Sequence, residues 1–512
     1  MKTKSVYSVI LISAIISLSF FYYDGQTEDS SIRNPVVAGK FYPADSSKLR
    51  NALNYFFEDA VLSNKERPIA IIAPHAGYIY SGQIAADAYN QARNFEYDVI
   101  IILGTNHTVS GFNKISIYQH GGFRTPFGVA LIDENITGQL LKEDDDCVTD
   151  IKPHETEHSV ETQVPFIQYL FPKAKIVPII IGTNDFKLCT KFGRALANIV
   201  KDKKALIVAS SDLSHYPNYE DAVSTDKSTL DIIKQMNPAD IHQELYTKLN
   251  SGIPSLVTCA CGEGPILAAI TAVKELGGTS ASIISYANTG NTLAGDNNRV
   301  VGYGAVAFYK TDQQTVIPGR SDANISNDNA TELDSLDKVT LLKLARRSIE
   351  QYLTSETLPL PRNLSPLMNS KRGAFVTLTK HGELRGCVGS MVDNLHLYNV
   401  VGKMALQAAF NDSRFQALEF NELSQVDIEI SVLTPLVKIK NTSEIVIGRD
   451  GVVIKKGGKQ AVFLPQVAKE QGWTKEQFLT QLCYKAGLEA LDLETSTLFT
   501  FRADVFSEKD FQ

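Results

Sequence analysis

The sequence predicts an α/β protein in which a large first domain with a mostly parallel sheet is followed by a smaller α+β domain. Two observations support this class. Short apolar runs alternate with helical patterns over the first three-fifths of the chain, and a polar stretch then precedes a region where one strand alternates strictly. Strands that alternate with helices favour a parallel sheet covered on both faces. The 512 residues are enough for two or three domains.

The composition excludes some functional classes. A hydrophobic content of 44% is sufficient for sizeable cores. The formal net charge of −7, without a block of Lys and Arg, gives no nucleic-acid signature, because phosphate binding needs a basic surface. Six cysteines are too few for a disulfide scaffold in a chain of this length, and no CxxC pair indicates a zinc ribbon.

The first 25 residues have the pattern of a signal peptide or a membrane anchor. Lys2 and Lys4 precede an uncharged apolar run at residues 5–23, which is nearly long enough to span a bilayer. No convincing cleavage site follows, so cleavage and anchoring stay equally open. We therefore expect an exported protein, periplasmic or otherwise extracytoplasmic, or one anchored by residues 5–23. This segment is the only part of the chain expected to contact a membrane.

Residues 33–310 show the alternating pattern of the first domain. Strands are expected at 69–73, 98–103, 176–181, 205–209 and 298–308, and helices at 84–93, 160–171, 189–201 and 262–276.

Three histidines follow three of these strands. His75 comes just after the first strand, His107 follows the second, and His215 closes the polar run after the strand at 205–209. Ligands of open parallel sheets bind outside the carboxyl ends of the strands. The sequence therefore predicts that the three histidines share one rim of the sheet, although each alone is as well explained by an ordinary turn.

Two further segments supply candidate polar groups. His158 and Glu161 have the spacing of one helix face, together with His154, and could reach a common metal or proton site. A solvated helix face is the alternative, and the spacing is not that of HExxH. Cys261 lies in a glycine-rich loop that opens a helix, where the thiol pKa is expected to fall. A buried structural cysteine is the alternative.

Six motifs in order resemble the Memo family over residues 33–310. They are Val37-Ala38-Gly39-Lys40-Phe41-Tyr42-Pro43, Pro74-His75-Ala76-Gly77-Tyr78, Gly104-Thr105-Asn106-His107, Glu157-His158-Ser159-Val160-Glu161, Ser211-Asp212-Leu213-Ser214-His215 and Cys261-Gly262. The family is similar in fold to the LigB-type extradiol dioxygenases, whose site holds non-haem iron. The resemblance implies a LigB-dioxygenase-like α/β domain.

The resemblance also implies a metal site formed by His75, His107 and Cys261. A cysteine in place of the carboxylate of a two-His-one-carboxylate site softens the ligand set, so copper is as plausible as iron, and zinc is possible. We expect His215, oriented by Asp212, to act as the acid and base.

The other residues of these motifs are expected to complete the site. His158 and Glu161 would form its polar wall as further catalytic groups. Tyr78 and Asn106 would contact a small-molecule substrate.

Residues 311–333 are polar and predict a linker. The second domain, 335–512, is expected to open with a helix at 341–353 and to contain strands at 373–378 and 426–433.

Leu384-Arg385-Gly386-Cys387-Val388-Gly389 and Asp412-Ser413-Arg414-Phe415 resemble the Ammecr family, protein A of the AmmeMemoRadiSam system, in which Memo is protein B. The resemblance implies a natural fusion and a radical-SAM system partner. Arg385 and Cys387 would be a substrate-binding arginine and a reactive thiol. A glycine-shaped turn with an Arg385–Asp412 ion pair is the alternative.

Three functions are compatible with these patterns. The first is a metal-dependent redox or dioxygenase-like enzyme acting on a small molecule. The second is a non-catalytic interaction or scaffold module that serves a radical-SAM-linked pathway. The third, metal-assisted hydrolysis, suits the many oxygen and nitrogen groups.

Overall fold

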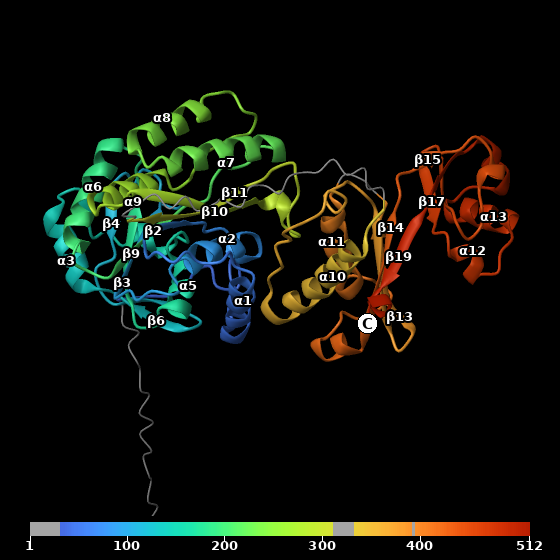
Figure 1. Ribbon diagram of the computed structural model, residues 1–512, viewed down its shortest axis with the longest axis horizontal. Helices are drawn as coiled ribbons and strands as arrows, with labels where there is room; N and C mark the ends of the chain where they lie inside the picture. The colour runs from blue at the N-terminus through green and yellow to red at the C-terminus, as the bar shows by residue number, and fades with distance from the viewer. Residues whose placement is uncertain (1–30, 311–331, 392–394, 512) are drawn as a thin grey trace, which may run out of the picture.

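The computed structural model describes residues 31–310, 332–391 and 395–511. The described chain forms a large α/β domain followed by an α+β domain, which confirms the predicted fold class (Figure 1). The segment proposed as a linker, 311–333, lies almost entirely outside the described residues, so the boundaries 33–310, 311–333 and 335–512 stay predictions.

An eight-stranded sheet forms the centre of the first domain. Its strands, in spatial order, are β10 (Ser280–Asn288), β11 (Gly302–Tyr309), β2 (Pro68–Ala73), β9 (Ala205–Ser210), β3 (Val99–Thr105), β8 (Lys175–Ile181), β4 (Ile115–Ile117) and β7 (Cys147–Val148). Neighbours from β2 through β9 and β3 to β8 pair in parallel, whereas β11 is antiparallel to β2. The four parallel strands therefore present their carboxyl ends at one edge.

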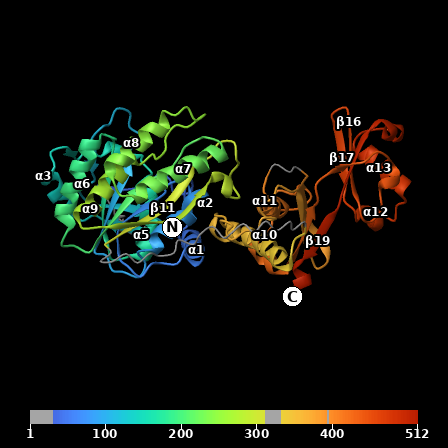
Figure 2. The same cartoon turned by 45° about the horizontal axis from the view of Figure 1, so that its top comes forward.

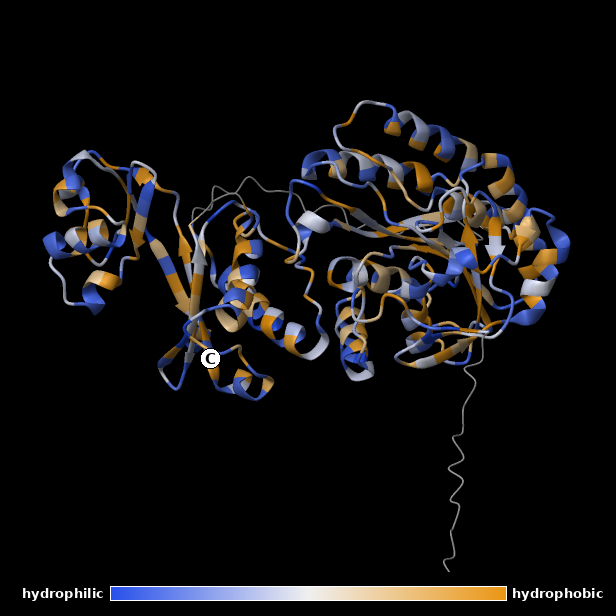
Figure 3. Cartoon of the chain, turned by 180° about the vertical axis from the view of Figure 1, so that it is seen from behind, coloured by the Kyte–Doolittle hydropathy of each residue, from blue (hydrophilic) through white to orange (hydrophobic). Residues whose placement is uncertain are grey.

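Helices cover both faces of this sheet, which explains why its central strands are almost continuously apolar. One face carries α3 (Glu134–Glu143), α6 (Phe186–Val200), α7 (Tyr219–Lys234), α8 (Pro238–Leu249) and α9 (Glu263–Glu275). The other carries α1 (Ser46–Glu58), α2 (Tyr78–Asn90), α5 (Val164–Leu170) and a small sheet of β1 (Ile32–Arg33), β5 (Gly122–Thr125) and β6 (Gly128–Leu131). Figure 3 shows hydrophobic residues concentrated on the strands and on the helix faces that meet them.

The predicted helix through residues 154–161 does not form. The helix α4 (Lys152–Glu155) ends before it, and a short 3-10 turn begins only at Glu161. The residues between run alongside the end of β3, where the Ser159 hydroxyl donates to the Thr105 carbonyl and accepts from the Thr105 amide. This side chain competes with helical hydrogen bonding, so the local spacing misled the helix prediction.

The second domain consists of a core and a distal lobe. The core packs α10 (Ser335–Ser355) and α11 (Leu397–Phe410) on a sheet of β13 (Glu383–Ser390), β12 (Ala374–Lys380), β14 (Val426–Leu433) and β19 (Ala503–Ser507). The distal lobe lies between β14 and β19 in sequence. It contains β15 (Val437–Lys438), β18 (Thr497–Phe501), β16 (Gly451–Lys456), β17 (Lys459–Phe463), α12 (Val467–Glu470) and α13 (Lys475–Lys485).

The two domains are in direct contact, since α1 packs against α10 (Figures 1 and 2) and side chains of α11 donate to the Gly290 and Gly295 carbonyls of the first domain. The buried side chain of Leu293, from the first domain, belongs to the apolar core of the second. The most enclosed ion pair between the domains joins Arg362 to Asp87, whose side chain is fully buried. The first domain therefore completes part of the apolar core of the second, and the second supplies the counterion of a buried carboxylate in the first.

The predicted signal peptide or membrane anchor requires a correction. Residues 1–25 lie outside the described residues, and no helix within 31–310, 332–391 or 395–511 is long and apolar enough to cross a membrane. Crossing requires about 20 consecutive apolar residues in one helix. The prediction of an exported or anchored protein that contacts the membrane through residues 5–23 is therefore wrong on this finding.

Candidate metal centre

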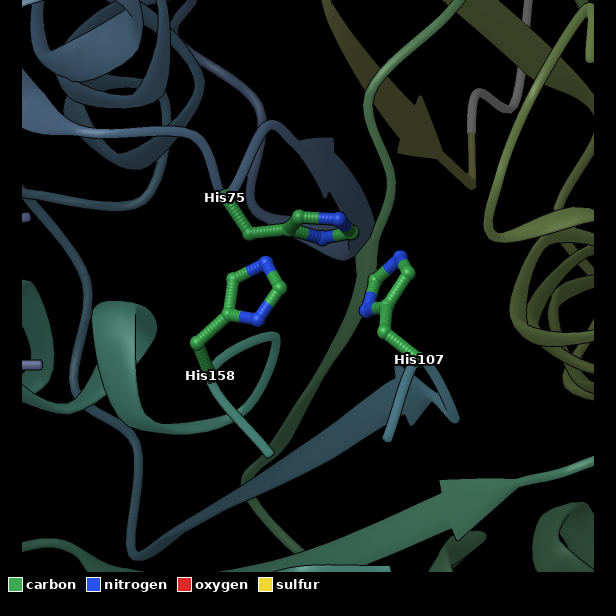
Figure 4. A group of neighbouring side chains, drawn as sticks. All are labelled: His75, His107 and His158. Atoms are coloured by element: carbon green, nitrogen blue, oxygen red, sulfur yellow. The ribbon is translucent and has the colours of Figure 1, made fainter. Parts of the chain in front are cut away.

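Three histidines converge at the carboxyl edge of the parallel strands (Figure 4). His75 follows β2 and His107 follows β3, as the sequence predicts, and His158 comes from the irregular segment after α4. One ring nitrogen from each lies within 4.8 Å of the corresponding nitrogens of the other two. This spacing suits three ligands of one metal ion.

Close contact between the segment at 157–159 and the end of β3 brings His158 to His107. A Cβ atom at Gly104 would come within 2.6 Å of the Ser159 hydroxyl oxygen, so only glycine permits this approach. The rings of His107 and His158 stack with centroids 4.7 Å apart. The glycine of this motif therefore serves the geometry of the centre.

Glu157 orients two of the three imidazoles. Its Oε1 lies 2.9 Å from Nδ1 of His107 and 3.3 Å from Nδ1 of His158, and its Oε2 accepts the His107 amide at 2.6 Å. The carboxylate is buried. Burial opposes its ionisation, but the hydrogen bond and charge of His107 lower the pKa of Glu157 to about 2. A carboxylate behind metal-binding imidazoles fixes their orientation and directs Nε2 to the metal.

Ser210 fixes the tautomer of His75. The Ser210 hydroxyl donates to the Ser159 carbonyl at 2.6 Å and accepts from the Gln163 amide, so it can only accept from Nδ1 of His75, 3.0 Å away. The proton of neutral His75 therefore resides on Nδ1, and Nε2 carries the lone pair that can bind a metal.

The charge state of the imidazoles also suits a metal. Burial holds the pKa of His75 well below its ordinary value and lowers that of His158 to about 4, so both rings are neutral. Burial also lowers the pKa of His107, but the hydrogen bond and charge of Glu157 outweigh it and raise the pKa overall. A metal ion binds the neutral form of this third ring, so it would compete there with a proton.

Cys261 lies beside the histidines but outside the group of three ligand atoms. Its Sγ is 3.2 Å from Nε2 of His75. Burial, with the nearby Asp212 carboxylate, raises the pKa of this thiol well above its ordinary value, the reverse of the expected effect of the helix N-terminus. The structure thus places Cys261 where it could be a fourth ligand, while His158 occupies the third position that was predicted for Cys261.

Asp212 and His215 lie beside the cluster. Within the described part of the chain, no hydrogen bond joins the two side chains. Oδ1 of Asp212 accepts from the amides of His75 and Ala76, and burial raises the pKa of this carboxyl to about 6. Burial lowers the pKa of His215 to about 4, and its buried Nε2 has no hydrogen-bond partner in the described chain. An unpaired buried nitrogen is costly, so a bound group is expected at this place.

Glu161 performs a different task from the one its spacing suggested. It forms a buried ion pair of 2.7 Å with Arg33 and accepts hydrogen bonds from the amides of Val36 and Val37 and from the Tyr42 hydroxyl. These contacts fix the segment that precedes α1. The carboxylate is therefore fully used in holding this segment.

The two residues predicted to contact substrate in this domain make internal contacts. The buried Tyr78 hydroxyl donates to the Thr162 carbonyl at 2.7 Å. The Asn106 side chain closes a turn, accepting from the Val109 amide and donating to the Val109 carbonyl. Both shape the loops of the centre, and a role in binding substrate stays a prediction.

Arg385 and Cys387 lie on β13 of the second domain, a strand that Figure 1 shows far from β2 and β3 of the first. Arg385 pairs with Glu422 at 3.0 Å, rather than with Asp412, and its buried Nη1 has no partner in the described chain. The Thr377 hydroxyl donates to the Cys387 sulfur, while Asp412 accepts the Cys387 amide. The structure thus corrects the ion pair of the alternative interpretation, since Asp412 pairs with Arg414.

Sequence reasoning assigned no role to Glu157 or Ser210. Glu157 precedes His158 directly in a motif that was recognised, so adjacency to a candidate ligand was the available signal. No local pattern marks Ser210, because its partners His75, Ser159 and Gln163 come from distant parts of the chain.

Comparisons with known proteins agree with these features. A family described as "Memo-like protein" matches residues 33–307, and one described as "AMMECR1" matches residues 342–506. A MEMO1 family protein of Methanosarcina mazei is 37% identical over 278 residues, which is 54% of this chain and 98% of the relative. One of Aquifex aeolicus is 36% identical over 280 residues, with shares of 54% and 99%.

Two solved structures of uncharacterized proteins also match. PH0010 of Pyrococcus horikoshii is 33% identical and covers 35% of this chain and 94% of its own, with a TM-score of 0.33. JW3007 of Escherichia coli is 12% identical and covers 47% and 99%, with a TM-score of 0.35. Because the Memo-like match covers more than half of the chain, the chain belongs to the Memo family and carries an AMMECR1 domain after the Memo domain.

Proposed function

We propose that this Memo–AMMECR1 fusion is a metal-dependent oxidoreductase that acts on a small molecule, with one iron or copper ion held by His75, His107 and His158. The observation that carries the proposal is the convergence of three imidazoles, two of them held by Glu157 and one by Ser210, with their ligand nitrogens turned inward. Three protein ligands leave coordination positions for substrate or water, as a catalytic metal requires. When bound, the ion would supply Lewis acidity and redox capacity.

The chain's own residues would manage protons beside the ion. Nε2 of His215 is buried and unpaired, so it can accept a proton from a bound substrate. Asp212, with a pKa raised to about 6 by burial, can hold or release a proton near neutral pH. Asp212 also fixes the loop that carries His75 through two amide hydrogen bonds.

The second domain supports a further part of the proposal. The presence of Memo and AMMECR1 domains in one chain agrees with a shared pathway, for which we propose a radical-SAM system partner. In that pathway the fusion would act on a small-molecule intermediate. A pull-down with the tagged chain from its own host, followed by identification of an enzyme with an iron–sulfur cluster, would test this partnership, and its consistent failure would contradict it.

The metal content of purified protein tests the central proposal. Wild-type protein purified without added metal should contain close to one equivalent of iron or copper by elemental analysis. His158→Ala should lose the metal, whereas His120→Ala, at an exposed histidine remote from the cluster, should retain it. Metal-free wild-type protein that remains metal-free after incubation with either ion would contradict the proposal.

Cys261→Ser separates the two ligand sets. If the three histidines hold the ion, this variant keeps most of its metal. Loss of metal from Cys261→Ser with retention in His158→Ala would instead support His75, His107 and Cys261. Oxygen consumption by the metal-loaded protein then distinguishes oxidative chemistry from hydrolysis.

A further inference from the structure

A cavity of about 560 Å³ lies at the junction of the two domains. Both domains contribute to it, and its walls include Lys40, Phe41, Ile79, Tyr352, Phe410 and Leu418. We call it the interdomain cavity. Its volume falls in the range of small-molecule sites, which often lie between domains.

The walls of the interdomain cavity are largely aromatic and aliphatic. Tyr352, from α10, and Phe410, from the end of α11, pack with ring centroids 5.1 Å apart. Phe410 is half-buried and Tyr352 is 42% exposed, so both rings remain partly accessible. An aromatic pair that remains accessible inside a concave site is suited to stack against a flat ring.

Phe41 connects the cavity to the metal centre. Phe41 lines the cavity, and its ring packs edge-on against the ring of His158, with centroids 4.9 Å apart. The Phe41 carbonyl accepts from the Tyr78 amide at 2.6 Å, and Gly39 permits the preceding turn with a φ of +77°. A molecule in the cavity would therefore lie one side chain away from the proposed metal ligands.

The charges at the rim indicate the polarity of the occupant. Lys48 is paired with Glu356 across the domain junction at 2.7 Å, so its charge is balanced. Lys40 is exposed at the same cavity and forms no ion pair within the described part of the chain. One unbalanced ammonium beside an aromatic wall suits a ligand with one negative charge and one ring.

We propose that the interdomain cavity binds a small aromatic carboxylic acid, with its ring among Phe41, Tyr352 and Phe410 and its carboxylate at Lys40. The second domain thus forms part of the recognition site, which no Memo domain could complete alone. Only the view that this acid is the substrate rests on the proposed function, because binding itself requires no metal.

Calorimetry on the full-length protein tests this inference, with phenylacetate as the probe and the protein both as purified and after chelation. Phenylacetate should bind in both states and more tightly than benzyl alcohol, which lacks the charge, or cyclohexylacetate, which lacks the flat ring. Phe410→Ala should weaken binding roughly tenfold, the equivalent of one lost aromatic contact. Phe420→Ala is the matched control, because Phe420 is 60% exposed and does not line the cavity.

Lys40→Met should weaken phenylacetate binding without changing that of benzyl alcohol. Tyr352→Ala should weaken the binding of both, and it decides the matter if Phe410→Ala fails to fold. Equal affinities for phenylacetate in wild type, Phe410→Ala and Tyr352→Ala, or no measurable binding, would overturn the inference. Tighter binding of phenyl phosphate than of phenylacetate would overturn the assignment to a monoanionic acid. Because binding is also measured on chelated protein, failure of the proposed metal function would not change the expected phenylacetate binding.

Discussion

At the scale of single residues, the carboxylate of Glu157 holds the metal centre together, although the sequence alone suggested no role for it. It touches both His107 and His158 and accepts three backbone amides, those of His107, His158 and Ser159. The same carboxylate therefore sets the path of the chain and the orientation of two rings.

We expect Glu157→Gln to lower metal affinity by roughly 10–100-fold, because a neutral amide holds the imidazoles more weakly and makes them poorer donors. Competition with a chelator of known affinity measures the change. Glu155→Gln alters an exposed glutamate two residues away and should have no effect. Equal affinities for wild type and Glu157→Gln would show that the carboxylate is only structural.

Asp226 is a second buried carboxyl, separate from the metal centre. It accepts from the Ser214 amide and from the Tyr286 hydroxyl, each at 2.8 Å, and burial raises its pKa to about 6. A carboxyl with a raised pKa in the folded state favours folding when protonated. This contribution is fully present below about pH 4 and is lost as the pH rises through about 6.

Asp226→Asn should therefore remove a fall in stability of about 3 kcal/mol between pH 4 and pH 6.5, because each pKa unit corresponds to 1.36 kcal/mol. Urea denaturation of wild type and variant at several pH values measures this difference. If the free energy of unfolding changes with pH equally in the two proteins, the pH dependence arises from groups other than Asp226.

At the scale of secondary-structure elements, the junction of α2 with the segment between α10 and β12 contains the most enclosed charge pair between the domains. Asp87 of α2 accepts from the Val61 amide, the Ser285 hydroxyl and both terminal nitrogens of Arg362. Its side chain is fully buried, whereas that of Arg362 is 26% exposed. The charge of Asp87 in the first domain is thus balanced by the second.

Arg362→Ala should destabilise the protein by roughly 3–5 kcal/mol, because it leaves a buried carboxylate without its counterion. Arg347→Ala is the comparison from the same junction, since Arg347 pairs with the half-exposed Asp59, and it should cost less than about 1 kcal/mol. Chemical denaturation followed by circular dichroism measures both. Similar small losses would show that water reaches Asp87 easily.

At the scale of the whole molecule, the two domains behave as one assembly in the structure, although they match two separate families. Leu293 of the first domain is buried in the core of the second, and the Asn399 side chain donates to the Gly290 carbonyl across the junction. We therefore expect an engineered protease site within residues 311–333 to yield fragments that remain associated.

Size-exclusion chromatography after cleavage tests this expectation. The fragments should co-elute at low salt, and Arg362→Ala should weaken their association. Immediate separation of two folded fragments would show that the junction is weak and that each domain is independent. The result also bears on the interdomain cavity, which needs both domains in place.

Local pattern was sufficient for much of the architecture. The apolar runs predicted β2, β3, β8 and β9 to within two residues at each end, because central parallel strands are buried on both faces. The motifs also identified both domains, and the position of His75 and His107 after parallel strands placed them at one edge. Short strands such as β4 and β7, and the sheet of β1, β5 and β6, have too few residues to show a period and were not predicted.

The sequence by itself determined the fold class, the family and two of the three clustered histidines, since these depend on residue order and strand period. Only the tertiary structure decided the rest of the centre. Whether His158 or Cys261 joins the ligand group, and whether Glu161 faces a site or Arg33, depends on loops that come from distant parts of the sequence, such as Arg33 and Glu161, which are 128 residues apart. Such contacts arise from close packing of distant segments, as at Gly104 and Ser159, so a short-range sequence pattern cannot predict them.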